Sequence, residues 1–289
     1  SDQFPYTNAR SSPALFGFDG TQTGFFDIQA FSQELRLTSP SEQRVRWEVG
    51  AYYLDWSRFV SLSTGVDTGA GIIRLERVPS RDARNPTTSF LADDNDNEAI
   101  AVFGQLAVDT TRNTELSLAL RYDEETRIQD VSPLQFPAGQ PGARNEATFD
   151  KLQPKLTFRY RPNERLNLYT TWGEGFRSGQ FNQNGIAAVA ASVGLTGVSD
   201  IADQEETESF EVGFKGQFLD DRMRVSAAVF DTSVEGQHFF SFIGAISAQI
   251  LTNIDEVDLR GGEIDLELKP SERFDLYASL GYTDSEIKA

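Results

Sequence analysis

The chain contains no cysteine and a single histidine, His238, among its 289 residues. Without thiols it forms no disulfide, thiolate metal site or cysteine nucleophile, and one histidine cannot build a multi-histidine metal centre. It also lacks any apolar run of 18 or more residues, and its mean hydropathy is -0.39. These absences exclude a transmembrane helix, but they do not exclude membrane-crossing strands, whose signal per segment is much weaker.

Basic side chains are scarce as well, since 26 Lys and Arg stand against 44 Asp and Glu and give a net charge of -18. A nucleic-acid partner is therefore excluded, because binding to phosphates depends on a basic surface that releases counterions. The first residues, "SDQFPYTNAR", lack the basic region and apolar core of a signal peptide. We expect a mature chain or a fragment of one.

The sequence does have a repeated format, in which two alternating strands are joined by a few turn-forming residues such as Pro, Asn, Asp and Ser. Ten strands can be counted in this way. The five strand pairs lie at 31–56, 102–125, 152–177, 210–233 and 261–285. Between them we predict long irregular loops, rich in Gly, Asp, Asn, Ser and Thr, at about 63–97, 128–148, 178–206 and 236–254.

Apolar and polar side chains alternate along these strands and therefore occupy opposite faces. In one strand Ile264 and Leu266 alternate with Glu263, Asp265 and Glu267. We predict that the carboxylate face lines water and that the apolar face meets lipid. For the strand that begins at Leu166, the predicted lipid-facing residues are Leu166, Leu168 and Trp172, and the predicted water-facing residues are Asn167, Tyr169, Thr171, Gly173 and Gly175.

Aromatic residues recur near both ends of the apolar segments, as in the girdles of outer-membrane barrels. The predicted lower girdle is Trp47, Tyr160 and Phe218, and the predicted upper girdle is Tyr53, Tyr122, Trp172 and Tyr282. The alternative is that aromatic residues simply favour strands. Because ten open strands leave two unpaired edges in lipid, we expect the chain to be part of a larger barrel.

Signals for catalysis are weak, and we predict no catalytic residue, no cofactor and no metal site. "GFRSG" at 175–179 places Ser178 fourth instead of third, which misses the nucleophile elbow. "DDNDNE" at 93–98 lacks the glycine and the bidentate glutamate of a calcium loop. We interpret it as a flexible acidic loop tip, with a nonspecific divalent cation that bridges lipopolysaccharide as the alternative.

Ligand contacts are expected where strands end and loops begin, from aromatic surface and a few polar anchors. The predicted ligand-binding residues are Arg177, Phe181, Asn182, Gln237, His238, Phe239 and Phe240, with Phe242 beside them. Arg177 suits an anionic chelate through charge-assisted hydrogen bonds. Its alternative role is as a partner for carboxylates of the wall.

Several stretches in order along the chain resemble the barrel of TonB-dependent outer-membrane receptors, among them "LQPKLTFRYRPNERLNLYTTWGEGFRSGQFN" (152–182) and "RGGEIDLELKPSERFDLYASLGYTDSEI" (260–287). Together they cover about half of the chain. The resemblance implies a 22-stranded antiparallel barrel with short periplasmic turns and long extracellular loops, closed by an N-terminal plug. It also implies that residues 1–289 are a middle segment of that barrel, which lacks the plug, the TonB box and the last strands.

The same resemblance implies a location in the outer membrane of a Gram-negative bacterium. The implied partners are the TonB complex of the inner membrane, a small-molecule nutrient, and outer-membrane lipid and lipopolysaccharide. The function it favours is active, TonB-dependent uptake of a scarce nutrient such as a ferric siderophore. The alternatives are cobalamin or oligosaccharide uptake by the same kind of receptor, a passive porin-type channel, and a soluble all-β binding domain.

Overall fold

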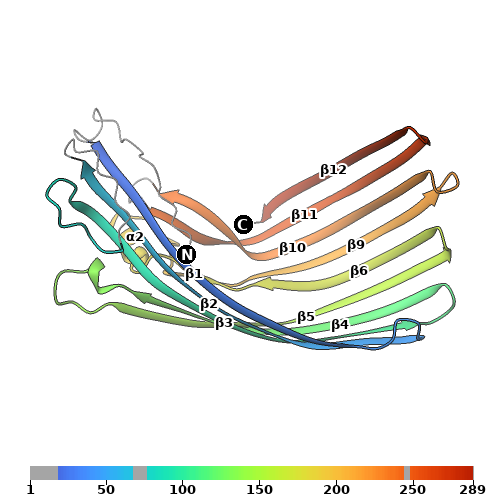
Figure 1. The fold of residues 1–289 in the computed structure, drawn as a ribbon, viewed down its shortest axis with the longest axis horizontal. Coiled ribbons are helices and arrows are strands. Elements are labelled where there is room, and N and C mark those ends of the chain that lie inside the picture. The colour runs from blue at the N-terminus through green and yellow to red at the C-terminus, as the bar shows by residue number, and fades with distance from the viewer. Residues whose placement is uncertain (1–18, 68–76, 244–247, 289) are drawn as a thin grey trace. The chain divides into compact units, whose positions relative to one another are not determined.

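A computed structural model describes residues 19–67, 77–243 and 248–288, and ten long strands form one antiparallel sheet in which each strand lies beside the next long strand of the chain (Figure 1). The strands are β1 (Asp19–Thr38), β2 (Val45–Asp67), β3 (Thr87–Asp109), β4 (Thr114–Val131), β5 (Ala143–Asn163), β6 (Leu166–Arg177), β9 (Glu205–Phe218), β10 (Met223–Ile243), β11 (Ala248–Ser271) and β12 (Phe274–Lys288). The predicted all-β class and the count of ten strands are confirmed.

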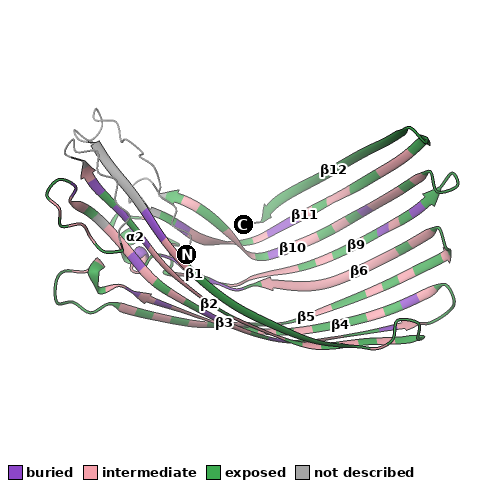
Figure 2. Ribbon diagram, in the orientation of Figure 1, coloured by how far each residue is buried: buried purple, intermediate pink, exposed green. Residues whose placement is uncertain are grey.

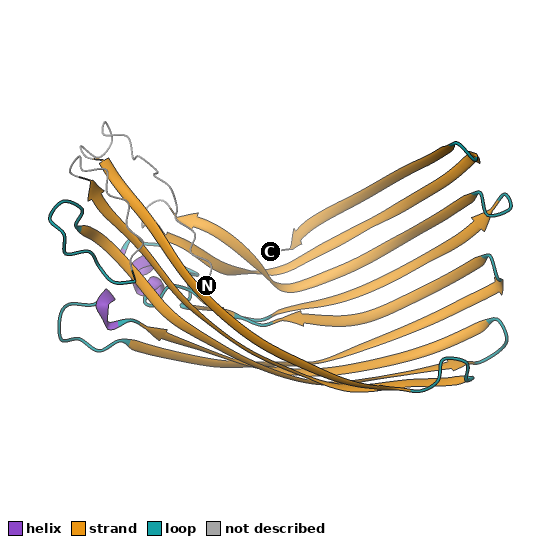
Figure 3. Cartoon of the chain, in the orientation of Figure 1, coloured by secondary structure: helices purple, strands orange, loops and turns teal. Residues whose placement is uncertain are grey.

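The other elements are short (Figure 3). They are the 3-10 helix η1 (Pro133–Gln135), the helix α2 (Ile186–Ser192), and the two-stranded sheet of β7 (Gln180–Phe181) and β8 (Ile201–Ala202). In the part of the chain that the structure describes, neither helix is long and apolar enough to cross a membrane.

The chain divides into two compact units. The first unit comprises Ser1–Gln33, Tyr53–Ala99 and Glu125–Thr148, and the second comprises Glu34–Tyr52, Ile100–Glu124 and Phe149–Ala289. All five short turns belong to the second unit, at the same end of its strands (Figure 1).

The turn between β5 and β6 lies slightly later than the Pro-Asn-Glu centre suggests. β5 continues to Asn163, with a register shift after Tyr160, and the Asn163 side-chain oxygen accepts a hydrogen bond from the backbone N–H of Arg165 at 2.9 Å. Such a local bond imitates a backbone turn. It closes the hairpin with Glu164 and Arg165 as the linking residues.

The predicted long loops are mostly shorter than expected. The connection predicted at 128–148 shrinks to 132–142, the one predicted at 63–97 shrinks to 68–86, and most of 236–254 is strand. Residues 68–76 and 244–247, which fall within two of these predictions, lie outside the described residues, as does the predicted mature start at 1–18. Only 178–204 is a long connection across its predicted length, and it contains β7, β8 and α2.

The prediction of a flexible acidic loop tip at 93–98 is wrong, because β3 runs through it. The physical reason is that two of its polar side chains are hydrogen-bonded to the neighbouring strand. Gln129 on β4 donates to Asp93 at 3.4 Å, and Asn97 donates to Glu125 on β4 at 2.8 Å. A strand with two polar faces has no alternation of apolar and polar residues, and its sequence therefore predicts a loop.

The predicted separation of faces agrees with the register of the second unit. On β6 and β9, Leu168 lies opposite Phe214 and Trp172 opposite Phe210, whereas the intervening pairs join Tyr169 to Gly213. The same separation continues into β11 and β12, where apolar pairs such as Leu266 with Ala278 alternate with polar pairs such as Asp265 with Ser279.

The apolar face is not buried in a protein core. Leu118, Leu168 and Leu276 are 45%, 38% and 53% exposed. The described buried apolar residues are few and include many alanines. Figure 2 shows buried residues scattered along the strands, while β12 is exposed along its whole length. The soluble all-β alternative needs these leucines inside, so the exposed face favours contact with lipid instead.

Aromatic side chains mark both ends of this apolar face. Near the short turns, Trp47, Tyr160 and Phe218 are 45%, 39% and 39% exposed. Towards the other end of the second unit, the Trp172 ring nitrogen donates to Glu208 at 2.7 Å and the Tyr122 hydroxyl contacts Asp150 at 3.3 Å. Rings with a polar tip suit an interface between lipid and water.

A cluster of ion pairs stabilises the polar face near the short turns. Glu115 on β4 is 8% exposed and accepts hydrogen bonds from Arg46 at 2.8 Å and from Arg159 at 2.6 Å. Arg46 also forms a two-pronged contact with Asp109, and Arg161 approaches Glu115 at 3.6 Å. One buried carboxylate thus joins strands β2, β4 and β5.

An arginine on the apolar face provides a direct test of lipid contact. Leu168→Arg is expected to lower the free energy of unfolding by about 1–2 kcal/mol, because Leu168 pairs with Tyr160 of the aromatic girdle and the cost of a lipid-facing guanidinium falls towards the interface. Asn167→Arg, one residue away on the polar face, is expected to change it far less. Urea titration of the intact protein in lipid vesicles measures both, and equal losses contradict the assignment of the faces.

Loss of the Glu115 carboxylate is expected to destabilise the same intact protein. Glu115→Gln keeps one acceptor oxygen but removes the negative charge that Arg46, Arg159 and Arg161 share, and it is expected to cost about 1–3 kcal/mol. Glu164→Gln, in the exposed β5–β6 turn, is the matched control and is expected to be near neutral. The shift in urea midpoint checks this expectation, and equal midpoints for the two variants refute it.

Candidate functional site: the polar wall and the strand ends

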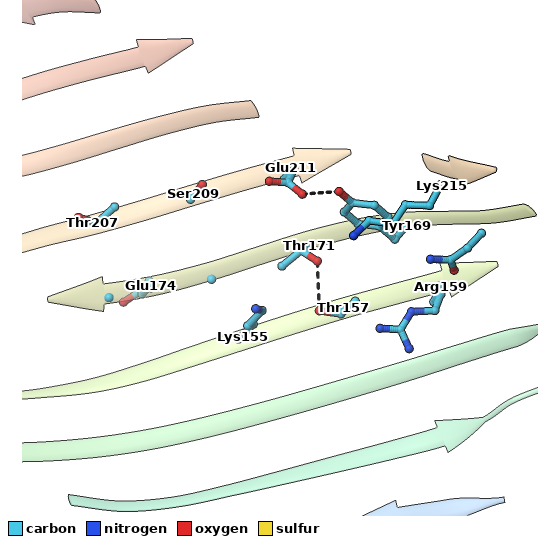
Figure 4. A pocket seen from close by; sticks show the side chains of 13 residues that line it. Lys155, Thr157, Arg159, Tyr169, Thr171, Glu174, Thr207, Ser209, Glu211 and Lys215 are labelled. Carbon is cyan, nitrogen blue, oxygen red and sulfur yellow. Dashed lines mark hydrogen bonds between the residues drawn. The ribbon is translucent and has the colours of Figure 1, made fainter. Parts of the chain in front are cut away.

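A polar wall lines one face of β5, β6 and β9 in the second unit (Figure 4). It bounds a concavity of about 630 Å³. Its lining residues are Lys155, Thr157, Arg159, Asn167, Tyr169, Thr171, Gly173, Glu174, Gly175, Thr207, Ser209, Glu211 and Lys215. All five residues predicted to face water on β6 are among them.

Two hydrogen bonds join polar groups of the wall to one another. The Tyr169 hydroxyl donates to Glu211 at 2.7 Å, and the Thr157 and Thr171 hydroxyls are 3.2 Å apart (Figure 4). Gly213 makes the first contact possible, because a Cβ at that position would stand 2.5 Å from the Tyr169 hydroxyl oxygen. The wall is therefore a polar, water-facing surface whose groups are only partly paired, since the side-chain oxygen of Asn167 is buried without a partner.

At the loop end of the second unit, one carboxylate brings two of the predicted ligand-binding residues together. Glu205 accepts a hydrogen bond from the Arg177 guanidinium at 3.2 Å and another from the backbone N–H of His238 at 2.8 Å. The His238 ring nitrogen Nε2 lies 2.7 Å from the carbonyl oxygen of Asp203. Arg177 therefore pairs with a carboxylate, as its predicted alternative role requires. Its side chain remains 53% exposed.

Asn182 is placed differently from its neighbours, because it is 7% exposed and binds backbone. Its amide nitrogen donates to the carbonyl oxygens of Ser199 and Leu251, and its side-chain oxygen accepts from the N–H of Leu251 at 2.8 Å. Ile186 of α2 packs against Ile250 beside this contact. Asn182 therefore fastens the β6–β9 connection to β11.

The predicted aromatic surface lies on β10 near its loop end. Phe239 and Phe240 are 53% and 62% exposed, and Phe242 is 66% exposed. Gln237 pairs with Ile254 on β11, and Phe181 pairs with Ile201 across the small β7–β8 sheet. Phe240 and Phe242 share one face of β10 with His238, and Phe239 lies on the opposite face, because successive strand residues alternate.

The first unit contains a polar row that the sequence interpretation missed. It consists of Arg58 on β2, Asp93, Asn95 and Asn97 on β3, Glu125, Arg127 and Gln129 on β4, and Gln135 of η1. Gln135 donates to Asp93 at 3.0 Å, and Arg127 donates to Glu125 at 2.8 Å. The alternating Asp-x-Asn-x-Asn of 93–97 was the available signal.

Burial raises the pKa of the Asp93 carboxyl, and the hydrogen bond from Gln135 opposes that rise. Burial also lowers the pKa of the Arg58 guanidinium, which the charge of Asp93 partly opposes. On β2, Arg58 lies five residues beyond Tyr53, the residue of the predicted upper girdle on that strand. Among the described residues, no group of three or more Asp, Glu or His side chains is arranged to hold a metal ion.

Sequence comparison identifies related proteins. A family model described as "TonB dependent receptor-like, beta-barrel" matches residues 1–288. The "Probable TonB-dependent siderophore receptor PiuA" of Acinetobacter baumannii is 26% identical over 225 residues, which cover 74% of this chain and 26% of that protein. The chain thus spans about a quarter of the length of this relative.

Solved structures share the fold. The ferric yersiniabactin uptake receptor FyuA of Yersinia pestis matches with a TM-score of 0.70 and 14% identity, over 93% of this chain and 37% of that one. The siderophore receptor PiuA of Acinetobacter baumannii matches with a TM-score of 0.66 and 18% identity, over 96% and 41%. At these identities the matches show the fold alone.

The ten-stranded antiparallel sheet, its two chemically distinct faces and the family match over nearly the whole sequence agree with one another. The predicted resemblance and the predicted location in the outer membrane of a Gram-negative bacterium are confirmed. The chain belongs to the TonB-dependent receptor β-barrel family and forms part of such a barrel.

Proposed function

We propose that residues 1–289 act as one barrel segment of a receptor for active, TonB-dependent uptake of a scarce nutrient, with a ferric siderophore as the cargo. The observation that carries this proposal is the family match over residues 1–288. PiuA is named as a siderophore receptor and FyuA as a ferric yersiniabactin uptake receptor, and these names support iron chelates as the cargo class. The TonB complex of the inner membrane supplies the energy through parts of the receptor outside this chain.

The loop end of the second unit is the proposed place of cargo contact. Phe239, Phe240 and Phe242 supply apolar ring surface, and Arg177 and His238 supply polar groups around Glu205. Large chelates are bound by apolar and aromatic surface with a few oriented polar groups. Gln237 and Phe181 complete the proposed site, and Asn182 holds the loop that carries Phe181.

The polar wall suits a passage for a large hydrophilic solute. Its acids and bases are paired or interspersed, as Tyr169 with Glu211 and Arg159 with Glu115 illustrate. Because acidic and basic side chains are interspersed on it, the wall has no large field of one sign to retain a cargo that must leave again. A passive porin would show the same wall, so transport dependence separates the two functions.

Transport by the intact receptor tests the proposal. Under iron limitation, cells that carry the gene are expected to accumulate labelled iron chelate, and cells without a working TonB complex are expected to accumulate almost none. Passive diffusion through a porin predicts uptake that is independent of TonB and open-channel conductance in planar bilayers. If cobalamin or an oligosaccharide, and not an iron chelate, is recovered with the purified receptor, the proposed cargo class is wrong.

Side-chain replacement tests the loop-end site. Phe240→Ala with Phe242→Ala, which removes two rings from one face of β10, is expected to weaken binding of the co-purified cargo about tenfold or more, because each ring contributes roughly 1.5–3 kcal/mol when buried. Phe210→Ala, on the apolar face, is the matched control and is expected to leave affinity unchanged. Arg177→Gln discriminates between the two roles of Arg177. If Arg177 contacts the ligand, the substitution lowers affinity; if it only pairs with Glu205, the substitution lowers stability and leaves affinity unchanged. Unchanged affinity in the double variant contradicts the site.

A further inference from the structure

The apolar face of the second unit contains a groove of about 480 Å³ that crosses β9, β10, β11 and β12. Its floor lies at Ala227 and Gly262, whose side chains are a methyl group and a hydrogen atom. Glu263 also borders the groove, but strand alternation directs its carboxylate to the polar face. The larger apolar side chains that form the walls include Leu168, Phe214, Val229, Ile264, Leu280 and Tyr282.

The groove is continuous with the face that meets lipid. Val229, Leu280 and Tyr282 at its walls are 61%, 72% and 70% exposed. Because lipid chains are as apolar as this wall, preference for one position on it comes from dispersion contacts, which are small singly and large together. A chain that lies in the groove touches protein on several sides and makes more of these contacts than a chain against a smooth wall. An acyl chain is therefore the occupant that suits the groove.

Charged side chains continue the same face directly beyond the groove. Arg260 follows Gly262 on β11 and Asp284 follows Tyr282 on β12, because alternate residues of a strand share a face, and Arg260 and Asp284 are opposite each other in the register. Arg260 donates to Asp231 at 2.8 Å, yet its side chain is 62% exposed. Among the described residues, Asp284 has neither a hydrogen bond nor an ion pair. An exposed cation and a free carboxylate thus lie side by side at one end of the groove.

This end of the face has more acids than bases. The acids are Asp231, Glu256, Asp258, Asp284 and Glu286, and the bases are Arg260 and Lys288. Lys288 is already engaged by Asp258 at 2.6 Å and by Glu256 at 2.9 Å. A head group that carries only phosphate charge is repelled by this excess, whereas one that carries both a phosphate and an ammonium group complements Arg260 and Asp284.

We propose that the groove holds one acyl chain of a zwitterionic phospholipid, with its phosphate at Arg260 and its ammonium group at Asp284. The chain lies over Ala227 and Gly262, and Tyr282 covers the boundary between chain and head group. This lipid occupies a discrete position on the barrel and exchanges more slowly than the lipid around it. The site is independent of the cargo that the receptor carries.

The test uses the intact receptor, stripped of lipid in detergent, and counts bound lipid molecules by native mass spectrometry. The probes are dioleoyl phosphatidylethanolamine, dioleoyl phosphatidylglycerol with the same chains and an anionic head group, and lipid A, which carries phosphates without an amine. Ala227→Phe fills the floor of the groove. It is expected to weaken the tightest phosphatidylethanolamine site about tenfold, as when about two methylene groups lose their apolar contact.

Two further variants complete the experiment. Val102→Phe adds the same ring to a 54% exposed apolar position on β3, outside the groove, and it is expected to leave the affinity unchanged. Asp284→Asn removes the free carboxylate and leaves the groove intact. It is expected to lower the preference for phosphatidylethanolamine over phosphatidylglycerol several-fold, and it decides the matter if Ala227→Phe fails to fold.

The proposal is overturned if phosphatidylethanolamine binding does not saturate, if Ala227→Phe matches Val102→Phe, or if Asp284→Asn leaves the preference unchanged. Phosphatidylglycerol or lipid A that binds the unaltered receptor at least as tightly assigns the site to an anionic lipid and overturns it as well. Concentration-dependent dimers that Ala227→Phe abolishes make a second copy of the receptor the occupant, and they contradict the lipid.

Discussion

Hydrocarbon offers no partner to a backbone N–H or C=O group, and this constraint governs the whole sheet. It requires each strand to pair on both sides, which the order from β1 through β12 achieves by placing each long strand beside the next one. It also makes the outermost strands informative. β1 and β12 each have one neighbour in this sheet, and family membership assigns the missing pairing to other strands of the barrel.

Once the backbone is satisfied, the side chains are free to divide between two solvents. Strand alternation does this with a period of two, so that Leu168 and Tyr169, adjacent in sequence, meet opposite environments. The carboxylates differ in their partners between the two faces. In the second unit the carboxylates of the polar face, such as Glu115 and Glu211, are bound by arginine or tyrosine, while those near the end of the apolar face bind aromatic rings with polar tips.

The sequence predicted the fold best where the two solvents differ most. In the segments from Leu166 and from Phe274 the alternation fixed the faces, and the short turns fixed the strand count. It failed at 93–98 and 236–254, where both faces of the strands are polar or exposed, so that paired polar residues resemble loops. The role of Asn182 was also out of reach, because its partner Leu251 lies 69 residues away.

The same contrast explains where a cargo can bind. On the polar wall some donors and acceptors are matched across neighbouring strands, as Tyr169 with Glu211 and Thr157 with Thr171 show. A matched surface guides a solute but discriminates weakly. Discrimination needs groups whose partners are incomplete, and the described examples are Arg58 and Asn95 in the first unit, Asn167 and Thr170 on β6, and His238 near the loop end of β10. We therefore expect cargo recognition in the segments near the loop ends, which the alternation of apolar and polar residues describes least well. Away from lipid, a strand needs neither that alternation nor a partner for every hydrogen-bond donor.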